Sequence, residues 1–300
     1  MTNAIATSDR PGSGAQLTTH YTLIQCIFSL AYCCVLYFAA VFLLARWFSS
    51  SAVGLTLTIA GGISLITQPS IAAFADRTNR LTLRQLVAGL MAVCALAALL
   101  LMIMPALFLP TAILYIVLFW AFNSQGSLVV ALALEHINAG TPVNFSLARG
   151  FGSFAFSALA LGLGYLVNRY GSEIIMPLTL IFSLIGVVLI GMFPKVIDPT
   201  SRSSLVASEQ AISFSEFARR HRRFMALLGG VTLLFFSHAL INTYSIQIVR
   251  HVGGSMAEMG IAGAIGSFIE LPAMALFPLL MVRVKRVGTI LKWSGVFFLF

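Results

Sequence analysis

The feature that most constrains this chain is a series of apolar stretches, each long enough to cross a lipid bilayer. A helix needs about 20 apolar residues to span a hydrocarbon core of about 30 Å. Eight stretches meet this requirement: residues 21–44, 52–75, 84–106, 111–134, 147–167, 174–193, 224–249 and 257–281. A ninth begins near Thr289 and continues to Phe300. Because unpaired backbone groups are costly in lipid, we expect each stretch to be a helix.

The composition supports a membrane protein and excludes a soluble enzyme. Apolar residues make up 59% of the chain, charged residues 9%, and the mean hydropathy is +0.97, whereas a soluble domain has about 25% charged residues. The cysteines share an apolar setting without the spacing of metal or disulfide sites: Cys26, Cys33, Cys34 and Cys94. We therefore expect buried thiols, and neither a metal nor a cofactor. The polar residues 1–20 precede a stretch too long for a signal peptide.

The basic residues indicate which side of the membrane each loop faces. If the N-terminus lies in the cytoplasm, fifteen of the 18 Lys and Arg residues fall on the inner side, and the other three are Arg46, Arg169 and Arg250. The positive-inside rule predicts this topology. It also accounts for the net charge of +9 without a nucleic-acid partner. We expect a multi-pass protein of the plasma membrane, of the bacterial inner-membrane kind.

The longest polar segment divides the apolar stretches into two groups. Residues 194–223 form a predicted cytosolic loop between a six-helix half, residues 21–193, and a second half, residues 224–300. Six spans, a long loop and further spans are typical of transporters built from two halves. The predicted fold is all-α, with a cytosolic tail at residues 1–20 and an incomplete C-terminal half. That half holds two full spans and the start of a third.

The central loop ends in a run of basic residues, Arg219-Arg220-His221-Arg222-Arg223. We interpret the run as part of a short cytosolic helix at the anionic inner surface of the membrane. Its simplest role is to anchor the topology, because positive charge is retained on the inner side. A regulatory role is the alternative.

The segment after the second stretch resembles the signature loop of the major facilitator superfamily, Gly-x-x-x-Asp-Arg/Lys-x-Gly-Arg/Lys. Asp76, Arg77 and Arg80 match it, while Ala72 and Asn79 replace the usual glycines. The preceding residues 68–69, Gln-Pro, are similar to the lactose permease branch. An acid beside arginines at a helix end can hold adjacent helices in one conformation and release them in another. The predicted role is a conformational latch, and the alternative is a solvated loop.

Residues 144–152 resemble the segment that opens helix five of the lactose permease family, Phe-Gly-x-Ala-Arg-x-x-Gly. The resemblance implies that Arg149 binds sugar and takes part in coupling. It places Phe156 where the family has the aromatic residue that stacks on sugar. The sugar-binding glutamate of helix four falls at Ala131, and the nearest acid is Glu135, one turn later. This departure argues against galactoside specificity.

Small residues in the fifth stretch predict close helix contacts. They include Gly150, Gly152, Ala158 and Gly162. Residues 150–155 also match the Gly-x-Gly-x-x-Ala pattern of dinucleotide-binding proteins. No strand precedes these residues, so nucleotide binding is rejected.

Glu270 is the acid placed deepest in an apolar stretch. It is 13 residues from Ala257 and 11 from Met281, which puts it about 20 Å and about 16 Å from the two ends of a helix. A charge at this depth costs at least about 2.5–3.5 kcal/mol, so the carboxyl should face a cavity or a partner. The resemblance aligns Glu270 with the helix-eight glutamate that contacts sugar and participates in proton coupling. The alternative is a structural carboxyl that hydrogen-bonds between helices.

Other polar residues in apolar stretches are candidates to line the same site. His238 and Asn242 are four residues apart and share a helix face. They would either line a cavity near Glu270 or be satisfied by an interhelical hydrogen bond. Weaker candidates lie in the first and fourth stretches: Gln25, Tyr32, Asn123 and Gln125.

These features favour a secondary active transporter. The expected activity is proton-coupled symport of a sugar, oligosaccharide or nucleoside-like solute by alternating access about a midplane site. Its partners would be the solute, protons and the bilayer, and the protein would be monomeric. Efflux of sugars or drugs on the same fold is the main alternative, and a multi-span receptor is a weaker one. An enzyme is not expected, because one acid and one histidine do not form a catalytic cluster.

Overall fold

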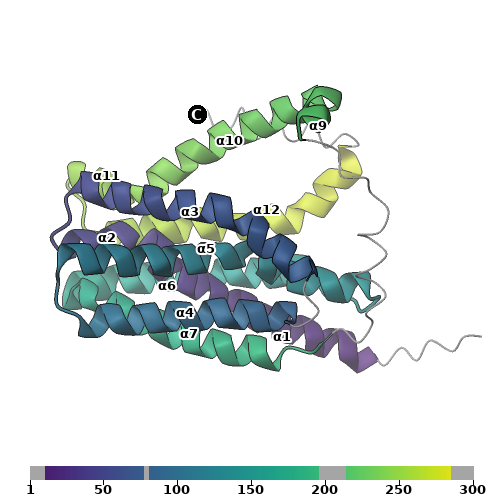
Figure 1. Ribbon diagram of the computed structural model, residues 1–300, viewed down its shortest axis with the longest axis horizontal. Coiled ribbons are helices and arrows are strands. Elements are labelled where there is room, and N and C mark those ends of the chain that lie inside the picture. Colours follow the sequence, from purple (N-terminus) through teal and green to yellow (C-terminus); the bar gives the residue numbers. More distant parts are fainter. Residues whose placement is uncertain (1–10, 78–80, 196–213, 285–300) are drawn as a thin grey trace, which may run out of the picture.

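The computed structural model describes residues 11–77, 81–195 and 214–284, and the regular structure in these ranges is helical (Figure 1). The first half contains α1 (Pro11–Tyr32), η1 (Cys33–Tyr37), α2 (Ala39–Ala45), α3 (Ser50–Arg77), α4 (Leu83–Ile103), α5 (Phe108–Asn138), α6 (Phe145–Tyr170), η2 (Ser172–Ile174) and α7 (Ile175–Met192). The rest contains α9 (Phe214–Arg220), α10 (Arg222–Thr243), α11 (Ser245–His251) and α12 (Met256–Arg283).

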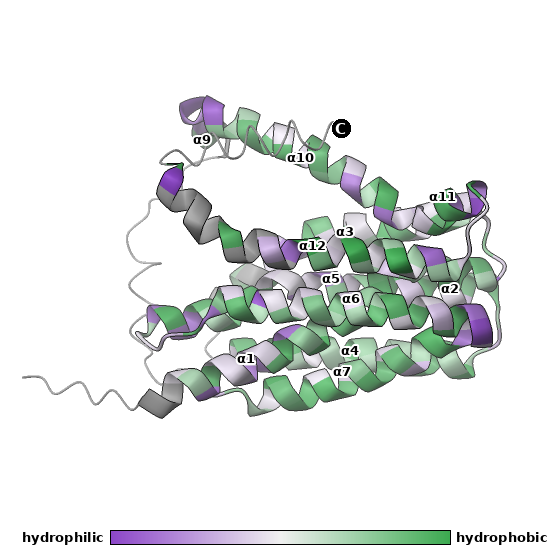
Figure 2. Ribbon diagram, turned by 180° about the vertical axis from the view of Figure 1, so that it is seen from behind, coloured by the Kyte–Doolittle hydropathy of each residue, from purple (hydrophilic) through white to green (hydrophobic). Residues whose placement is uncertain are grey.

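The apolar stretches form helices, as the sequence predicts. In the described part of the chain, seven helical segments are long and apolar enough to cross a membrane. The eighth expected stretch forms α12, which is 28 residues long. The ninth lies outside the described residues. Hydrophobic residues extend along the helices and hydrophilic ones gather at their ends and on α9 (Figure 2), which is the distribution that a bilayer requires.

Two stretches predicted as continuous helices are interrupted. The first contains one π-helical turn, η1, closed by a hydrogen bond from Phe38 N to Cys33 O at 3.0 Å. The seventh breaks at Tyr244, where the backbone leaves helical geometry between α10 and α11. Apolar length determines how far a stretch reaches but not whether its helix is regular, so composition does not reveal such breaks.

The first helix begins earlier than the sequence suggests. Residues 11–20, expected as part of a polar tail, form the start of α1. Tertiary contacts hold this polar extension, because His20 lies within hydrogen-bonding distance of the Leu189 carbonyl, at 2.8 Å. Gly14 also lies against Pro142.

The long helices lie side by side, and their ends define two faces of the bundle (Figure 1). We call the end with Arg84, Arg149, Lys195 and α9 the basic end, and the end with α2 and α11 the opposite end. In the first half, α1 packs on α6 and α7, and α4 packs on α5 and α7. The second half joins the first mainly through α12 on α6. From α11, α10 and α12 diverge toward the basic end (Figure 1).

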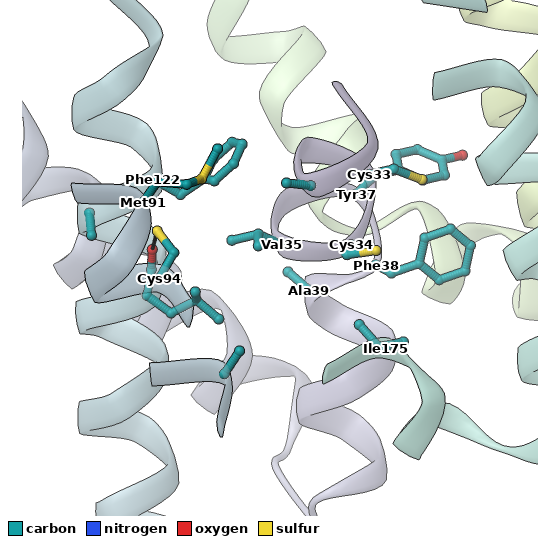
Figure 3. Close-up of a cluster of buried hydrophobic side chains, with 14 of the residues drawn as sticks. Cys33, Cys34, Val35, Tyr37, Phe38, Ala39, Met91, Cys94, Phe122 and Ile175 are labelled. Carbon is teal, nitrogen blue, oxygen red and sulfur yellow. Dashed lines mark hydrogen bonds between the residues drawn. The ribbon is translucent and has the colours of Figure 1, made fainter. Parts of the chain in front are cut away.

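Three of the four cysteines lie in the apolar core, and Cys26 is partly buried. Figure 3 shows Cys33 and Cys34 near Phe38, and Cys94 close to Met91. The thiols are free. They therefore act as small apolar side chains, as expected from the sequence.

At the basic end, side chains from three helices bind carbonyls at and just beyond the end of α7, where a helix leaves carbonyls without internal partners. The closest contacts are His20 to Leu189 at 2.8 Å, Arg84 to Phe193 at 2.8 Å and His136 to Pro194 at 3.2 Å. The sequence gives no indication of these contacts, because each joins residues more than 50 positions apart.

At the opposite end, the buried guanidinium of Arg46 joins three elements. It donates to the Leu101 and Met104 carbonyls, each at 3.2 Å, and to Glu173 Oε2 at 2.9 Å. Arg46 directly follows α2, the two carbonyls lie at the C-terminal end of α4, and Glu173 lies on η2. The positive-inside rule predicted only that Arg46 lies on the outer side of the membrane. The structure shows that its side chain also joins the ends of α2 and α4 to η2.

We expect Arg46→Gln to lower the free energy of unfolding by about 1–3 kcal/mol, because buried carbonyls lose their donors. Thermal unfolding of the detergent-solubilised protein measures the change. Arg169→Gln is the control, because Arg169 is an exposed arginine at the same end whose neighbour is the Tyr170 ring. Equal melting temperatures for the two variants would contradict the role of Arg46.

Candidate functional site

Helix α6 presents three candidate residues toward α1 and α12. The Asn144 side chain caps its start by accepting from Leu147 N at 3.0 Å, as N-cap residues do. Arg149, Ser153 and Phe156 then follow at spacings of four and three residues, which places them on one face. The cap at Asn144 sets where α6 begins, and the spacing from there places these three side chains on one face of the helix.

A hydrogen bond between α6 and α12 lies at the middle of this arrangement. Ser153 Oγ on α6 donates to Glu270 Oε2 on α12 at 2.7 Å. Ser153 is buried, whereas Glu270 is exposed. Glu270 lies near the midpoint of α12, between Met256 and Arg283. The carboxyl thus has a partner on α6, and the sequence did not identify Ser153 as that partner.

Tyr32 connects this pair with Arg149. Its ring centroid lies 5.9 Å from that of Phe156, and its side chain is 38% exposed. Tyr32 is within electrostatic range of both Arg149 and Glu270. Arg149 is exposed and makes no ion pair with Glu270 in the described structure. Arg149 and Glu270 therefore both lie in the neighbourhood of Tyr32, but they are not paired with each other.

Gln25 of α1 lies beside the same face of α6. A Cβ built on Gly152 would lie 3.1 Å from Gln25 Cγ and 2.8 Å from Ser29 Oγ, so glycine permits this close approach. Gln25 is buried, and its Oε1 has no hydrogen-bond partner among the described residues. Buried polar atoms are nearly always paired, so Oε1 is an available acceptor. Gly162, expected at a close contact, has open space around it, and Gly164 makes that contact instead.

An aromatic cluster lines the junction of α1, α5 and α6. Phe28 stacks on Phe122 with centroids 4.8 Å apart, and Phe122 lies 6.3 Å from Tyr32. Phe156 then contacts both Tyr32 and Tyr37. Sequence reasoning identified Phe156 and Tyr32 but missed the others. The four-residue spacing of Phe28 and Tyr32 was the available signal, and core packing explains such spacing equally well.

Three predicted residues make their hydrogen bonds away from Glu270 in the described structure. His238 and Asn242 share a face, as predicted, but their hydrogen bond, at 2.8 Å, is within α10. No such interaction links them to Glu270. Asn123 is partly buried, and its backbone carbonyl accepts from Gln68 Nε2 at 3.1 Å, which joins α5 to α3.

The predicted latch lies at the edge of the described chain. Asp76 and Arg77 are the last residues of α3, and their side chains lie outside the description. Arg80 is also outside the described residues. The latch therefore stays a prediction.

Between the candidate site and the opposite end, α6 and α12 approach to backbone contact. A Cβ built on Gly164 would lie 2.8 Å from the Met256 carbonyl oxygen and 2.9 Å from Gly260 Cα. Nearby, the Tyr37 hydroxyl donates to the Met259 carbonyl at 2.9 Å. We call these contacts of Tyr37 and Gly164 with Met256–Gly260 the glycine seal. It leaves no room for a side chain between α6 and α12 on that side of Glu270.

Comparison with known proteins identifies the fold. Crystal structures of the nucleoside transporter NupG and of its D323A mutant match with TM-scores of 0.67 and 0.68, at 14% sequence identity. Each match covers 89% of this chain and 68% of the transporter. None of the curated proteins matches the sequence. The model of the MFS_1 like family matches residues 19–294. The chain therefore belongs to the MFS_1 like family and is a multi-pass major facilitator transporter rather than an enzyme.

Proposed function

We propose that the protein is a proton-coupled symporter of a sugar, oligosaccharide or nucleoside, and that Glu270 carries the proton. The observation that supports this most is the Ser153–Glu270 hydrogen bond between the two halves. An ionised carboxylate accepts a hydrogen bond about twice as strong as a neutral one. Protonation would therefore weaken the link between α6 and α12. A proton would in this way bias the relative position of the halves, which is what coupling requires.

The surrounding side chains suit a neutral solute with hydroxyl groups. Arg149 offers guanidinium donors, Gln25 Oε1 offers an unpaired acceptor, and the exposed part of the Tyr32 ring offers an apolar face. Such a mixture is usual in small-molecule sites. The likeness to NupG, whose structure is described as that of a nucleoside transporter, makes nucleosides the first solutes to test. The lactose permease resemblance makes sugars the second.

The proposed orientation places the basic end in the cytoplasm. Basic residues collect on the cytoplasmic side of membrane proteins, and Arg84, Arg149 and Lys195 lie at this end. The glycine seal then lies on the external side of Glu270. The described conformation would be the one that faces inward in the plasma membrane.

Solute-dependent proton movement tests the proposal directly. The full chain is reconstituted in liposomes of known orientation with an internal pH dye, and nucleosides and sugars are added outside. Acidification of the interior that depends on a solute would support symport. Counterflow without proton movement, proton movement of the opposite sense, or saturable binding without flux would instead favour facilitation, efflux or a receptor.

Ser153→Ala is expected to reduce proton-driven uptake about tenfold, because a hydrogen bond to a charged group contributes about 1.5–3 kcal/mol. Ser153→Thr keeps the hydroxyl and should retain most activity. Ser157→Ala is the matched control, since Ser157 lies one turn later and its buried Oγ has no partner in the described structure. Initial rates of labelled-solute uptake measure all three. A similar loss in Ser153→Ala and Ser157→Ala would contradict a specific role for the hydrogen bond.

A further inference from the structure

The junction of α9 and α10 forms a bend lined by basic side chains. His221 separates the helices with a non-helical backbone, at φ −115° and ψ 46°. Around this bend is an open cavity of about 490 Å³, lined only by consecutive residues: Arg219, Arg220, His221, Arg222, Arg223 and Phe224. We call this feature the arginine bend. It lies outside the candidate transport site.

The charges of the arginine bend have no counter-charge in the described structure. The four arginines are exposed, and none forms an ion pair with a described carboxylate, Glu216 of α9 included. The cavity also faces the first turn of α10, a helix of 22 residues whose N-cap, His221, makes no side-chain capping bond. Free amide groups and the helix dipole add positive potential there. The bend is therefore suited to an anion.

Aromatic rings lie among these charges. The Phe217 ring centroid is 4.7 Å from that of His221 and 6.1 Å from that of Phe224, and both phenylalanines are exposed. Phe224 begins the apolar surface of α10, a helix without a buried residue. Basic groups beside exposed aromatic side chains at the start of a span are typical of the membrane interface. A soluble anion would neutralise the arginines but leave these rings in water.

We propose that the arginine bend binds the phosphate of an anionic glycerophospholipid in the leaflet at the basic end. The phosphodiester takes hydrogen bonds from the guanidinium groups, and the acyl chains extend along Phe224 and α10. The bound lipid holds the start of α10, the long helix that packs least against the rest of the described protein. This proposal does not depend on which solute is carried.

Lipid binding to the full chain in detergent tests the proposal. Native mass spectrometry measures the apparent affinity for dioleoyl phosphatidylglycerol, with dioleoyl phosphatidylcholine for comparison. We expect Arg219→Gln/Arg220→Gln to bind phosphatidylglycerol about thirtyfold more weakly, since each basic residue near an anionic surface contributes about 1 kcal/mol. Arg169→Gln/Arg250→Gln removes the same charge from exposed positions at the opposite end and should bind within about threefold of the unsubstituted protein.

Two further measurements distinguish a lipid site from general charge effects. Arg219→Lys/Arg220→Lys keeps the charge and should retain most of the affinity, and melting temperatures in phosphatidylcholine should match among the variants. An equal loss in the two Gln pairs would overturn the proposal, as would a loss in the Lys pair as large as in the matching Gln pair. Complete displacement of phosphatidylglycerol by millimolar inorganic phosphate would also overturn the proposal, because a free anion would then be the ligand.

Discussion

Glu270→Gln is expected to abolish uphill accumulation of solute while leaving exchange of solute down its gradient. Glutamine keeps the size and hydrogen-bonding capacity of the protonated glutamic acid but cannot release a proton. The site should therefore still bind solute and change conformation, without any link to the proton gradient. Accumulation driven by an imposed pH gradient, and counterflow in its absence, measure the two activities in the same proteoliposomes.

A second carboxyl on the same helix provides the control for Glu270→Gln. Glu258 lies in the first turn of α12, and its carboxylate accepts a hydrogen bond from the N–H of Ser255, just before the helix, at 2.8 Å. Glu258→Gln should leave both accumulation and counterflow near normal. Normal proton-driven accumulation by Glu270→Gln would show that this carboxyl does not carry the coupled proton, and loss of counterflow as well would indicate a role in binding or folding.

Gly260→Leu is expected to stop transport by preventing the glycine seal from closing. A Cβ at this position would overlap the Ala160 carbonyl oxygen and lie 2.9 Å from Gly164 Cα. These are backbone atoms, which do not rotate away, so the helices must separate. Overpacking of this kind costs about 1–3 kcal/mol, which shifts the ratio of two conformations of similar energy by about fivefold to about 150-fold. The glycine seal between α6 and α12 should then be open, toward the opposite end, for most of the time.

Thiol labelling measures whether the seal has opened. Ala257 is buried in the first turn of α12, so Ala257→Cys in a background without native cysteines should react slowly with a membrane-impermeant maleimide. We expect Gly260→Leu to raise the labelling rate at least about fivefold, in line with the shift in population. Gly266→Leu is the control, because a Cβ there meets nothing within 4 Å. Normal transport and unchanged labelling in Gly260→Leu would contradict a moving seal.

The candidate site contains one residue that the sequence predicts and a partner that the sequence does not predict. Glu270 was predictable because an acid in the middle of an apolar stretch is costly and therefore conspicuous. Ser153 was not, because a serine is tolerated at many places in a membrane helix and its partner lies 117 residues away. The expected neighbours His238 and Asn242 instead pair with each other. Four-residue spacing predicts a shared face but not what that face meets.

The sequence by itself determined that the chain is a helical membrane protein and where most of its spans lie, whereas the division into two halves about the central loop stays a prediction. These properties depend on local quantities, namely the length of apolar stretches and the position of charges along the chain. Only the tertiary structure decided the π-helical turn at η1, the Arg46 contacts, the glycine seal and the Ser153–Glu270 hydrogen bond. Each of these depends on how helices distant in sequence pack against one another. An apolar helix face is equally stable against lipid and against another helix, so hydropathy cannot specify which faces meet.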